Sequence, residues 1–237
     1  MMIDVLKKSI NSKFWNILFN KFLKINLLDL IDPKIFIFKL DNLNLDIKIF
    51  YDFAHRNPHT NYMADQDDTY QSNHDIETKS EFKDIKIQIE NFLDKKLKNK
   101  IFKKNTLGKF KLKSMWFVIM KKNSHHNMHS HPKSAFTGVI YLKVNKNEAS
   151  SALKVLIPKF NKDKYKLDNF YNQIIDKKTN LIDEKKNQTE LIDKKLFNFI
   201  PDNNDMIVFN SYMIHGIDKY ESKEDRIALA WDAVYTI

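Results

Sequence analysis

The chain has no cysteine among its 237 residues. Disulfide bonds and thiolate metal sites are therefore excluded, and a reducing compartment is the natural location. No apolar run reaches the roughly 18 residues that a membrane-spanning helix needs. Residues 1–11 also lack the long apolar stretch that follows the basic start of an export signal. We therefore expect a cytoplasmic protein without a membrane span.

Arginine and glycine are almost as scarce as cysteine. Of 40 lysines and arginines only Arg56 and Arg226 are arginine, and the three glycines are Gly108, Gly138 and Gly216. A guanidinium grips a carboxylate through two parallel hydrogen bonds, which an ammonium cannot reproduce. An arginine retained in such a lysine-rich chain is therefore a candidate ligand for a carboxylate. Gly216 follows a histidine directly, where it either turns a corner or permits a close backbone approach or a positive φ.

The net charge of +10 raises the question of nucleic-acid binding, which lysines and arginines drive by neutralising phosphates. The basic residues are scattered along the chain, however, and 30 acidic residues are interleaved with them. A solvated, lysine-rich surface accounts for this pattern. Nucleic acid stays open as a partner but is not favoured, and the oligomeric state is undetermined at this stage.

A chain of this length is expected to fold as one domain with a sizeable core. We expect residues 1–45 to form an N-terminal extension of helical and extended segments packed on the core. Residues 46–237 are expected to form the main domain. A charged insertion at about 159–195 is expected to project from it, because that segment is rich in charge and poor in strand-forming residues.

The spacing of apolar residues predicts the secondary structure of most of the chain. Three- and four-residue spacing predicts one or two amphipathic helices over 3–30 and a helix over 80–99. Near-alternation predicts an extended segment over 35–51, and the polar residues 57–75 predict a loop. Short β-branched and aromatic segments predict strands at 112–120, 135–144, 152–157, 206–210 and 226–235.

Three histidines stand next to predicted strands. His129 and His131 precede one strand, and His215 follows another. Side chains two residues apart in an extended chain point the same way, so His129 and His131 can present both rings to one ion. Imidazole suits Fe(II), and mononuclear iron oxygenases leave positions open for co-substrate and oxygen. Because Arg226 follows His215 by eleven residues, the pattern indicates redox chemistry at a non-haem iron site that also holds a dicarboxylate.

Two blocks of sequence carry a resemblance to a known family. The first contains His-Ser-His-Pro at 129–132 and Thr-Gly-Val-Ile-Tyr at 137–141. The second contains Val-Phe-Asn-Ser at 208–211 and Asp-Arg-Ile-Ala-Leu-Ala-Trp-Asp at 225–232. These motifs resemble the H-x-H-P, S-G-V-Y-Y, L-F-P-S and e-R-I-S-I-A-F-D motifs of a 2-oxoglutarate/Fe(II)-dependent oxygenase family. The resemblance extends over about 46–237, apart from the insertion.

This resemblance implies a double-stranded β-helix, a mostly β, cupin-like jelly roll with flanking helices, whose open mouth holds the metal. It implies Fe(II) and 2-oxoglutarate as cofactors of a dioxygenase that hydroxylates a substrate carbon and releases succinate and carbon dioxide. On the family pattern, His129 and His215 are iron ligands, and Arg226 binds the distal carboxylate of 2-oxoglutarate. Tyr141 resembles the strand tyrosine that hydrogen-bonds the same carboxylate. Thr137 stands where the family has serine and completes the expected cofactor-binding set.

The chain departs from most 2-oxoglutarate oxygenases at His131, which occupies the position of the acid in their H-x-D motif. A neutral imidazole leaves the site more positive than an aspartate does. His131 is a third ligand, a hydrogen-bond donor behind the ligands, or the neighbour of a position filled by water, which would permit a halide and halogenation. We include it in the expected metal and catalytic set of His129, His131 and His215.

The remaining histidines are expected at the surface: His55, His59, His74, His125 and His126. His126 could also line the entrance to the site, and His74 follows a Gln-Ser pair that is similar to one upstream in the family. Trp116 and Trp231 fall on predicted strands and are expected in the core.

Two other functions stay open. One is a three-histidine cupin-type dioxygenase that needs no oxoacid, against which Arg226 argues. The other is a catalytically silent jelly-roll binding module, against which the complete set of His129, His215 and Arg226 argues. The substrate, a small molecule or a protein, is beyond the sequence, because the loops that form pocket walls carry no readable code.

Overall fold

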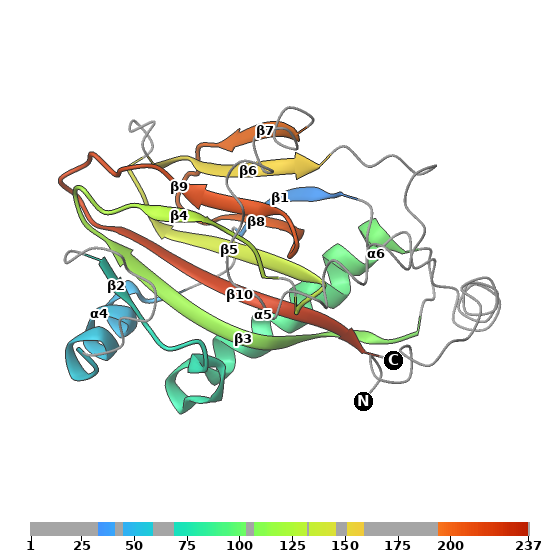
Figure 1. Cartoon of the computed structure of the whole chain (residues 1–237). Helices are drawn as coiled ribbons and strands as arrows, with labels where there is room; N and C mark the ends of the chain where they lie inside the picture. Colours follow the sequence, from blue (N-terminus) through green and yellow to red (C-terminus); the bar gives the residue numbers. More distant parts are fainter. Residues whose placement is uncertain are drawn as a thin grey trace.

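The computed structural model describes residues 33–40, 45–58, 69–102, 107–131, 133–145, 151–158 and 194–236. Within them, two antiparallel β-sheets pack on each other, and helices cover the outer face of the larger sheet (Figure 1). One hydrophobic cluster lies between the two sheets, and a second lies between the larger sheet and the helices. The larger sheet is therefore buried on both faces.

The larger sheet has six strands in the order β1-β8-β5-β10-β3-β2. Their bounds are β1 (Ile35–Lys39), β8 (Asp205–Asn210), β5 (Phe136–Lys143), β10 (Arg226–Thr236), β3 (Lys109–Met120) and β2 (Thr69–Gln71). The smaller sheet has four strands in the order β4-β9-β6-β7. Their bounds are β4 (His126–His129), β9 (Ile214–Ile217), β6 (Leu153–Pro158) and β7 (Lys194–Phe199).

The helical layer follows from a four-residue apolar repeat. Ile85, Ile89, Leu93 and Leu97 recur on one side of consecutive helical segments and are buried against the larger sheet. The segments are α4 (Ile47–Arg56), the short 3-10 turns η2 (Ile76–Thr78) and η3 (Ser80–Phe82), α5 (Lys83–Phe92), the π-helical turn η4 (Leu93–Leu97) and α6 (Lys98–Ile101).

Alternation along β10 decides which side chains enter the space between the sheets. Its odd-numbered apolar residues from 227 to 231 pack with the helices, whereas its alanines at 228 and 230 belong to the cluster between the sheets. Successive side chains of a strand point to opposite faces. Arg226 and Asp232 therefore lie on the same face as these two alanines, toward the smaller sheet.

The predicted strands at 112–120, 135–144, 152–157, 206–210 and 226–235 are confirmed as β3, β5, β6, β8 and β10. The predicted helix over 80–99 is confirmed by α5 and the turns beside it. The short strands β2, β4, β7 and β9 were not predicted from the sequence.

The extended structure predicted for 35–51 is wrong in its second half, because α4 begins at Ile47. Asp46 caps this helix, since its side chain accepts a hydrogen bond from the backbone N–H of Lys48 at 2.9 Å. Phe50 and Phe53 are then buried on one side of the helix. The buried residues of this segment thus follow helical spacing.

Parts of the predicted domain layout lie outside the described residues. These are the helices over 3–30 and nearly all of the insertion at 159–195, whose last residues begin β7. β1 lies within the predicted extension 1–45 and pairs with β8 as an edge strand of the larger sheet. The division of the chain at residue 46 stays a prediction.

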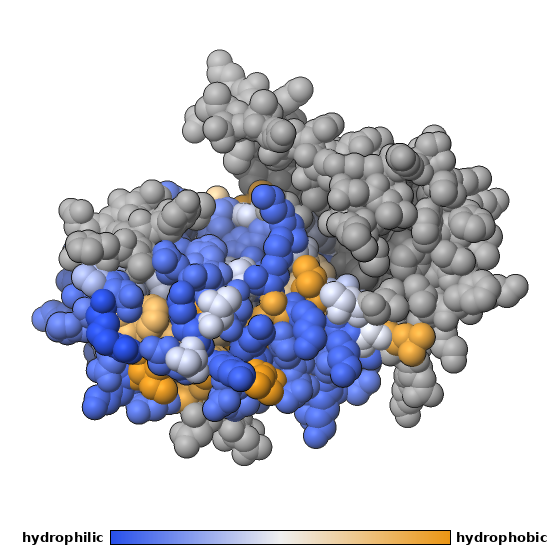
Figure 2. Space-filling model, turned by 90° about the horizontal axis from the view of Figure 1, so that it is seen from below, coloured by the Kyte–Doolittle hydropathy of each residue, from blue (hydrophilic) through white to orange (hydrophobic). Residues whose placement is uncertain are grey.

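Figure 2 looks at the helical side of the molecule from below the view of Figure 1. This face is mainly hydrophilic, with hydrophobic residues scattered between the charged ones. Tyr51 of α4 and Ile87 of α5 are 37% and 44% exposed, which is ordinary for single apolar residues on a solvated surface. In the described part of the chain, no helix is long and apolar enough to cross a membrane.

Gly138 is required by close packing between two strands of the larger sheet. Gly138 on β5 is the cross-strand partner of Trp231 on β10, and a Cβ atom added there would lie 2.0 Å from Cζ2 of the indole. We therefore expect Gly138→Ala to lower the free energy of unfolding by about 1–3 kcal/mol, the usual cost of overpacking. Denaturant unfolding measures this loss, and the same change should cost less in a Trp231→Phe background. An equal loss in both backgrounds would exclude this contact as the cause.

Candidate active site

The three histidines of the predicted metal site come together where β4 meets β9. His129 ends β4 and is the cross-strand partner of His215 on β9, and His131 follows two residues later. Their ring centroids lie 4.4 to 5.1 Å apart, and one ring nitrogen of each lies within 4.8 Å of the others. Three imidazole nitrogens this close form a ligand set that suits Fe(II) and related metals.

Gly216 allows the two histidine-bearing strands to approach. A Cβ atom at Gly216 would lie 2.7 Å from the backbone oxygen of His126 and 2.8 Å from Sδ of Met128. Its φ is not positive. Of the roles that the sequence left open for Gly216, the close backbone approach is therefore confirmed. A larger residue here would push β4, and with it His129, away from His215.

Each of the three rings uses its Nδ1 in a hydrogen bond to a carbonyl or carboxylate oxygen. The bonds run from His129 to the backbone oxygen of Asn127 at 2.7 Å, from His215 to that of Met213 at 3.0 Å, and from His131 to both carboxylate oxygens of Asp232 at 2.9 and 3.0 Å. Because these oxygens accept, each Nδ1 carries the proton and the Nε2 lone pair is free. Such outer partners fix the tautomer and orientation of metal-binding histidines. The three residues therefore fit a metal ion held through Nε2.

Burial favours the neutral form of two of these imidazoles. It lowers the pKa of His215 well below its ordinary value, and the neighbouring His129 and His131 rings lower that pKa further. Burial also lowers the pKa of His129. Both rings are consequently neutral at neutral pH, so that each can offer a lone pair to a metal without first losing a proton.

Asp232 is held in place from both neighbouring strands. Thr137 on β5 and Ser114 on β3 are its cross-strand partners. Their hydroxyl groups donate to the Asp232 carboxylate at 2.6 Å and 3.3 Å. Together with the bond from His131, these donors orient a largely buried carboxylate, which is 8% exposed. Asp232 was not among the predicted site residues, although strand alternation places it on the same face as Arg226.

Arg226 is a buried cation without a counter-ion among the described residues. It is 1% exposed, and its Nε and Nη2 have no hydrogen-bond partner among the described residues. Its Nη1 contacts Sδ of Met120 at 3.4 Å, and its Cζ lies 5.0 Å from the centre of the Tyr141 ring. Burying an unpaired guanidinium is costly. This arrangement indicates the position of an anionic ligand.

Tyr141 presents a hydroxyl group to the same place. This hydroxyl is buried beside the Arg226 guanidinium, which interacts with it, and it has no other hydrogen-bond partner in the described part of the chain. Burial raises the pKa of Tyr141 to about 12, so the hydroxyl is protonated at neutral pH and can donate to an anion. Arg226 and Tyr141 together offer the donors that one carboxylate group needs.

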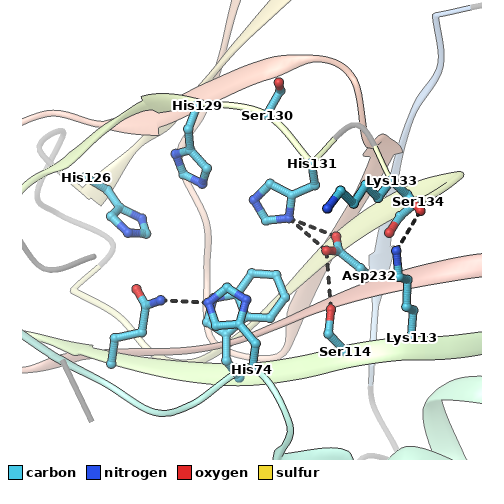
Figure 3. A pocket seen from close by; sticks show the side chains of 12 residues that line it. His74, Lys113, Ser114, His126, His129, Ser130, His131, Lys133, Ser134 and Asp232 are labelled. Carbon is cyan, nitrogen blue, oxygen red and sulfur yellow. Dashed lines mark hydrogen bonds and ion pairs between the residues drawn. The ribbon is translucent and has the colours of Figure 1, made fainter. Parts of the chain in front are cut away.

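A cavity of about 420 Å³ opens beside the three histidines (Figure 3). His126, His129 and His131 point into it. Trp116 forms part of its wall, and the ring of His74 stacks on this indole with 4.1 Å between centroids. The cavity thus combines an aromatic wall with several imidazole groups next to the candidate metal ligands.

Two lysines lie at the end of the cavity opposite His126 (Figure 3). Nζ of Lys113 donates to the backbone oxygen of Lys133 at 3.0 Å, and Ser134 lies beside this pair. The polar groups of the lining are mainly hydrogen-bond donors, because its carboxylate, Asp232, is already engaged, whereas most of the lining surface is apolar. The cavity is therefore suited to a molecule with both apolar and hydrogen-bonding groups.

Of the two positions that the sequence left open for His126, the surface and the entrance to the site, the structure shows the second, because His126 lines the cavity. His126 is partly buried in β4, its ring centroid lies 5.0 Å from that of His129, and burial lowers its pKa to about 3. Trp231 is fully buried as predicted, and Trp116 is 3% exposed but also lines the cavity. His74 lies at the cavity, as its position beside the Gln-Ser pair suggested.

The comparison with known sequence families supplies the identity. Residues 114–232, half of the chain, match the model of a family described as "Putative 2OG-Fe(II) oxygenase". The chain belongs to this 2-oxoglutarate/Fe(II) oxygenase family. Of the predicted enzyme class, the 2-oxoglutarate/Fe(II) oxygenase is thereby confirmed, as are the predicted cofactors, Fe(II) and 2-oxoglutarate. No curated protein sequence matches the chain.

Solved structures share the fold at low sequence identity. The non-haem α-ketoglutarate-dependent carbocyclase SnoK from nogalamycin biosynthesis aligns with a TM-score of 0.56 at 9% identity, over 96% of this chain and 84% of its own. HygX from Streptomyces hygroscopicus, solved with nickel and 2-oxoglutarate bound, aligns with a TM-score of 0.51 at 11% identity, over 95% and 87%. At such identities the likeness concerns the fold alone, and the predicted jelly roll is confirmed.

Proposed function

We propose that this oxygenase holds Fe(II) through His129, His131 and His215 and binds the distal carboxylate of 2-oxoglutarate through Arg226 and Tyr141. The observation that carries the proposal is the buried guanidinium of Arg226, which has no counter-ion among the described residues and lies beside a buried tyrosine hydroxyl. The three Nε2 lone pairs are the complementary feature, because all three Nδ1 atoms are already used. These groups fit a metal and a dicarboxylate together.

The two parts of the proposed site lie close to each other. His126 has its ring 5.0 Å from that of His129, and its pKa is also lowered by the charge of Arg226. Arg226 also shares one face of β10 with Asp232, which holds His131. A dicarboxylate gripped at Arg226 can therefore extend toward the three histidines.

Each residue has a defined task in the proposed reaction. When bound, Fe(II) and 2-oxoglutarate activate oxygen, so that one oxygen atom enters a substrate C–H bond as a hydroxyl and the other enters succinate as carbon dioxide leaves. The histidines bind through Nε2, and their Nδ1 bonds keep the rings from turning. Arg226 orients 2-oxoglutarate with its planar fork, and the hydroxyl of Tyr141 donates to the same carboxylate.

Thr137 has a different task from the one expected. Its hydroxyl group donates to Asp232 at 2.6 Å, and it is 1% exposed. We propose that Thr137 supports the metal site through Asp232 instead of contacting 2-oxoglutarate.

Hydroxylation is the proposed outcome for an unidentified substrate, a small molecule or a protein side chain, bound in the cavity. The fold does not restrict the outcome to hydroxylation, since SnoK is named as a carbocyclase. The cytoplasm stays the proposed compartment, supported by the lack of cysteine. Nucleic acid is not favoured as a partner.

The three-imidazole set favours one second candidate, a dioxygenase that acts without an oxoacid. Such an enzyme binds no oxoacid and therefore does not need a buried arginine that can bind a carboxylate. Arg226 therefore argues against it, as it argues against a silent binding module.

Turnover of 2-oxoglutarate without substrate tests the proposal. We expect purified protein loaded with Fe(II) to convert 2-oxoglutarate slowly to succinate, and we expect His215→Ala protein to form none. Succinate measured by mass spectrometry is the readout, and protein loaded with Zn(II) is the control. Oxidation of an added compound at the same rate with and without 2-oxoglutarate would favour the second candidate. For a compound that stimulates succinate release, incorporation of one atom of ¹⁸O from labelled oxygen distinguishes hydroxylation from ring closure.

A further inference from the structure

The ligand set of this site lacks a negative charge. Two histidines and one aspartate would offset one unit of the charge on Fe(II), whereas His129, His131 and His215 offset none as neutral rings. A more positive metal site differs from a site with an aspartate ligand in its affinity for ligands and in the electronic properties of its metal. The reason is that the bound cation is the largest local charge in such a site. A carboxylate beside the three histidines would supply the missing charge.

Asp232 is that carboxylate, and it contacts only one of the three rings. His129 and His215 have Nδ1 bonded to backbone carbonyl oxygens, which are neutral. His131 has Nδ1 bonded to both oxygens of Asp232, at 2.9 and 3.0 Å. A carbonyl oxygen would be enough to orient a ring. The charged hydrogen-bond partner, Asp232, thus belongs to His131, the histidine that occupies the position of the acid in the H-x-D motif.

Among the described residues, the close ion pair of Asp232 is with His131. Within the described residues, His131 is the only basic side chain within 4.0 Å of this carboxylate, although Lys113 and Lys133 line the same cavity. Thr137 and Ser114 donate to one oxygen each. A buried carboxylate is costly unless it is paired and hydrogen-bonded. Asp232 meets both conditions through groups that also hold it against His131.

We infer that Asp232 supplies the negative charge of this metal centre through His131, in place of a carboxylate ligand. The inference rests on the proposed role of His131 as a ligand. A carboxylate on Nδ1 draws the proton of the ring toward itself, which makes Nε2 a stronger electron donor. Asp232 is accordingly a positioning residue for His131, and the imidazole and the carboxylate act as one anionic unit.

The first test removes the charge and keeps the shape. We expect Asp232→Asn to weaken the binding of Co(II), used as an oxygen-stable probe, by about 10–100-fold, the range for losing an outer partner of a metal ligand. Isothermal titration measures the dissociation constant, and near-UV circular dichroism reports on the fold. Asp218→Asn is the matched control, because the Asp218 side chain is 63% exposed and pairs with Lys154. Unchanged Co(II) binding by Asp232→Asn would overturn the inference.

The second test asks whether the charge is needed only because His131 is neutral. In a His131→Asp background the ligand itself is anionic, and Asp232 would face a second carboxylate. We expect Asp232→Asn to leave Co(II) binding unchanged or to strengthen it in that background. A merely structural Asp232 would cause the same loss in both backgrounds, and that result would overturn the inference. Should the His131→Asp protein not fold, Asp232→Glu, which keeps the charge, must bind Co(II) more tightly than Asp232→Asn.

The His131→Ala variant separates this inference from the proposed function. If His131→Ala binds Co(II) as wild type does, the proposed ligand set fails, and the inference falls with it. If His131→Ala loses Co(II) while Asp232→Asn keeps it, the ligand set stands and the inference alone fails. Weaker binding in both variants supports both.

Discussion

Replacing His215 with alanine is expected to abolish metal binding. His215 is the most buried of the three candidate ligands, at 5% exposed, and its pKa is lowered so far that its ring is neutral at any pH near 7. Losing an outer partner of a ligand costs about 10–100-fold in metal affinity. Removing the ligand itself is expected to cost more than that.

Metal content after loading and dialysis, measured by emission spectroscopy, checks this expectation. His55→Ala is the matched control, because His55 is exposed on α4, outside the candidate site. Circular dichroism should show the β-rich fold in both variants. A His215→Ala protein that retains one equivalent of iron would contradict the proposed site.

Replacing Arg226 with lysine is expected to weaken the binding of 2-oxoglutarate while leaving metal binding intact. Lysine keeps the charge but lacks the planar fork that binds a carboxylate through two hydrogen bonds. A charge-assisted hydrogen bond is worth about 1.5–3 kcal/mol, which corresponds to a roughly 10- to 150-fold higher dissociation constant. The loss is expected near the upper end, because Arg226 is buried where water cannot replace the missing donor.

Titration of 2-oxoglutarate into Co(II)-loaded protein measures this effect. Arg56 is the only other arginine in the chain, and its side chain is 60% exposed beside Glu81. Arg56→Lys is therefore the matched control and should bind 2-oxoglutarate as wild type does. Normal affinity in Arg226→Lys would remove the main support for a dicarboxylate at this position and would favour the oxoacid-independent candidate.

The two variants separate the two halves of the site. His215→Ala is expected to lose the metal, whereas Arg226→Lys is expected to keep it and to lose affinity for 2-oxoglutarate. If both variants lost metal equally, a shared folding defect would be the explanation, and the melting temperatures would show it.

Much of the candidate site could be predicted because its signals are local in sequence. His129 and His131 are two residues apart, and β10 alternates strictly, so that the face carrying Arg226 could be read from single segments. The ordered pair of histidine and arginine motifs then placed the chain in its family. The long strands of the larger sheet were predicted for the same reason, since they are buried and rich in β-branched and aromatic residues.

The short polar strands could not be predicted in this way. β4 consists of His-Asn-Met-His, which has no apolar alternation. It is a strand because its backbone pairs with β9, and that pairing depends on the space left by Gly216. For residues 47–56 the apolar spacing is compatible with either a strand or a helix. The helix forms because Asp46 caps its first turn and because Phe50 is buried on one side of it.

By itself, the sequence determined which residues are candidates for binding a metal and a carboxylate and the strand faces on which they lie, because strand alternation is set by the backbone alone. Only the tertiary structure decided that Asp232 stands behind His131, a contact between residues 101 positions apart. That contact depends on the register of β10 between β3 and β5, which brings Ser114 and Thr137 to the same carboxylate. Register is a property of paired strands. The pairing of Asp232 with His131 therefore could not be predicted from any single segment of the chain.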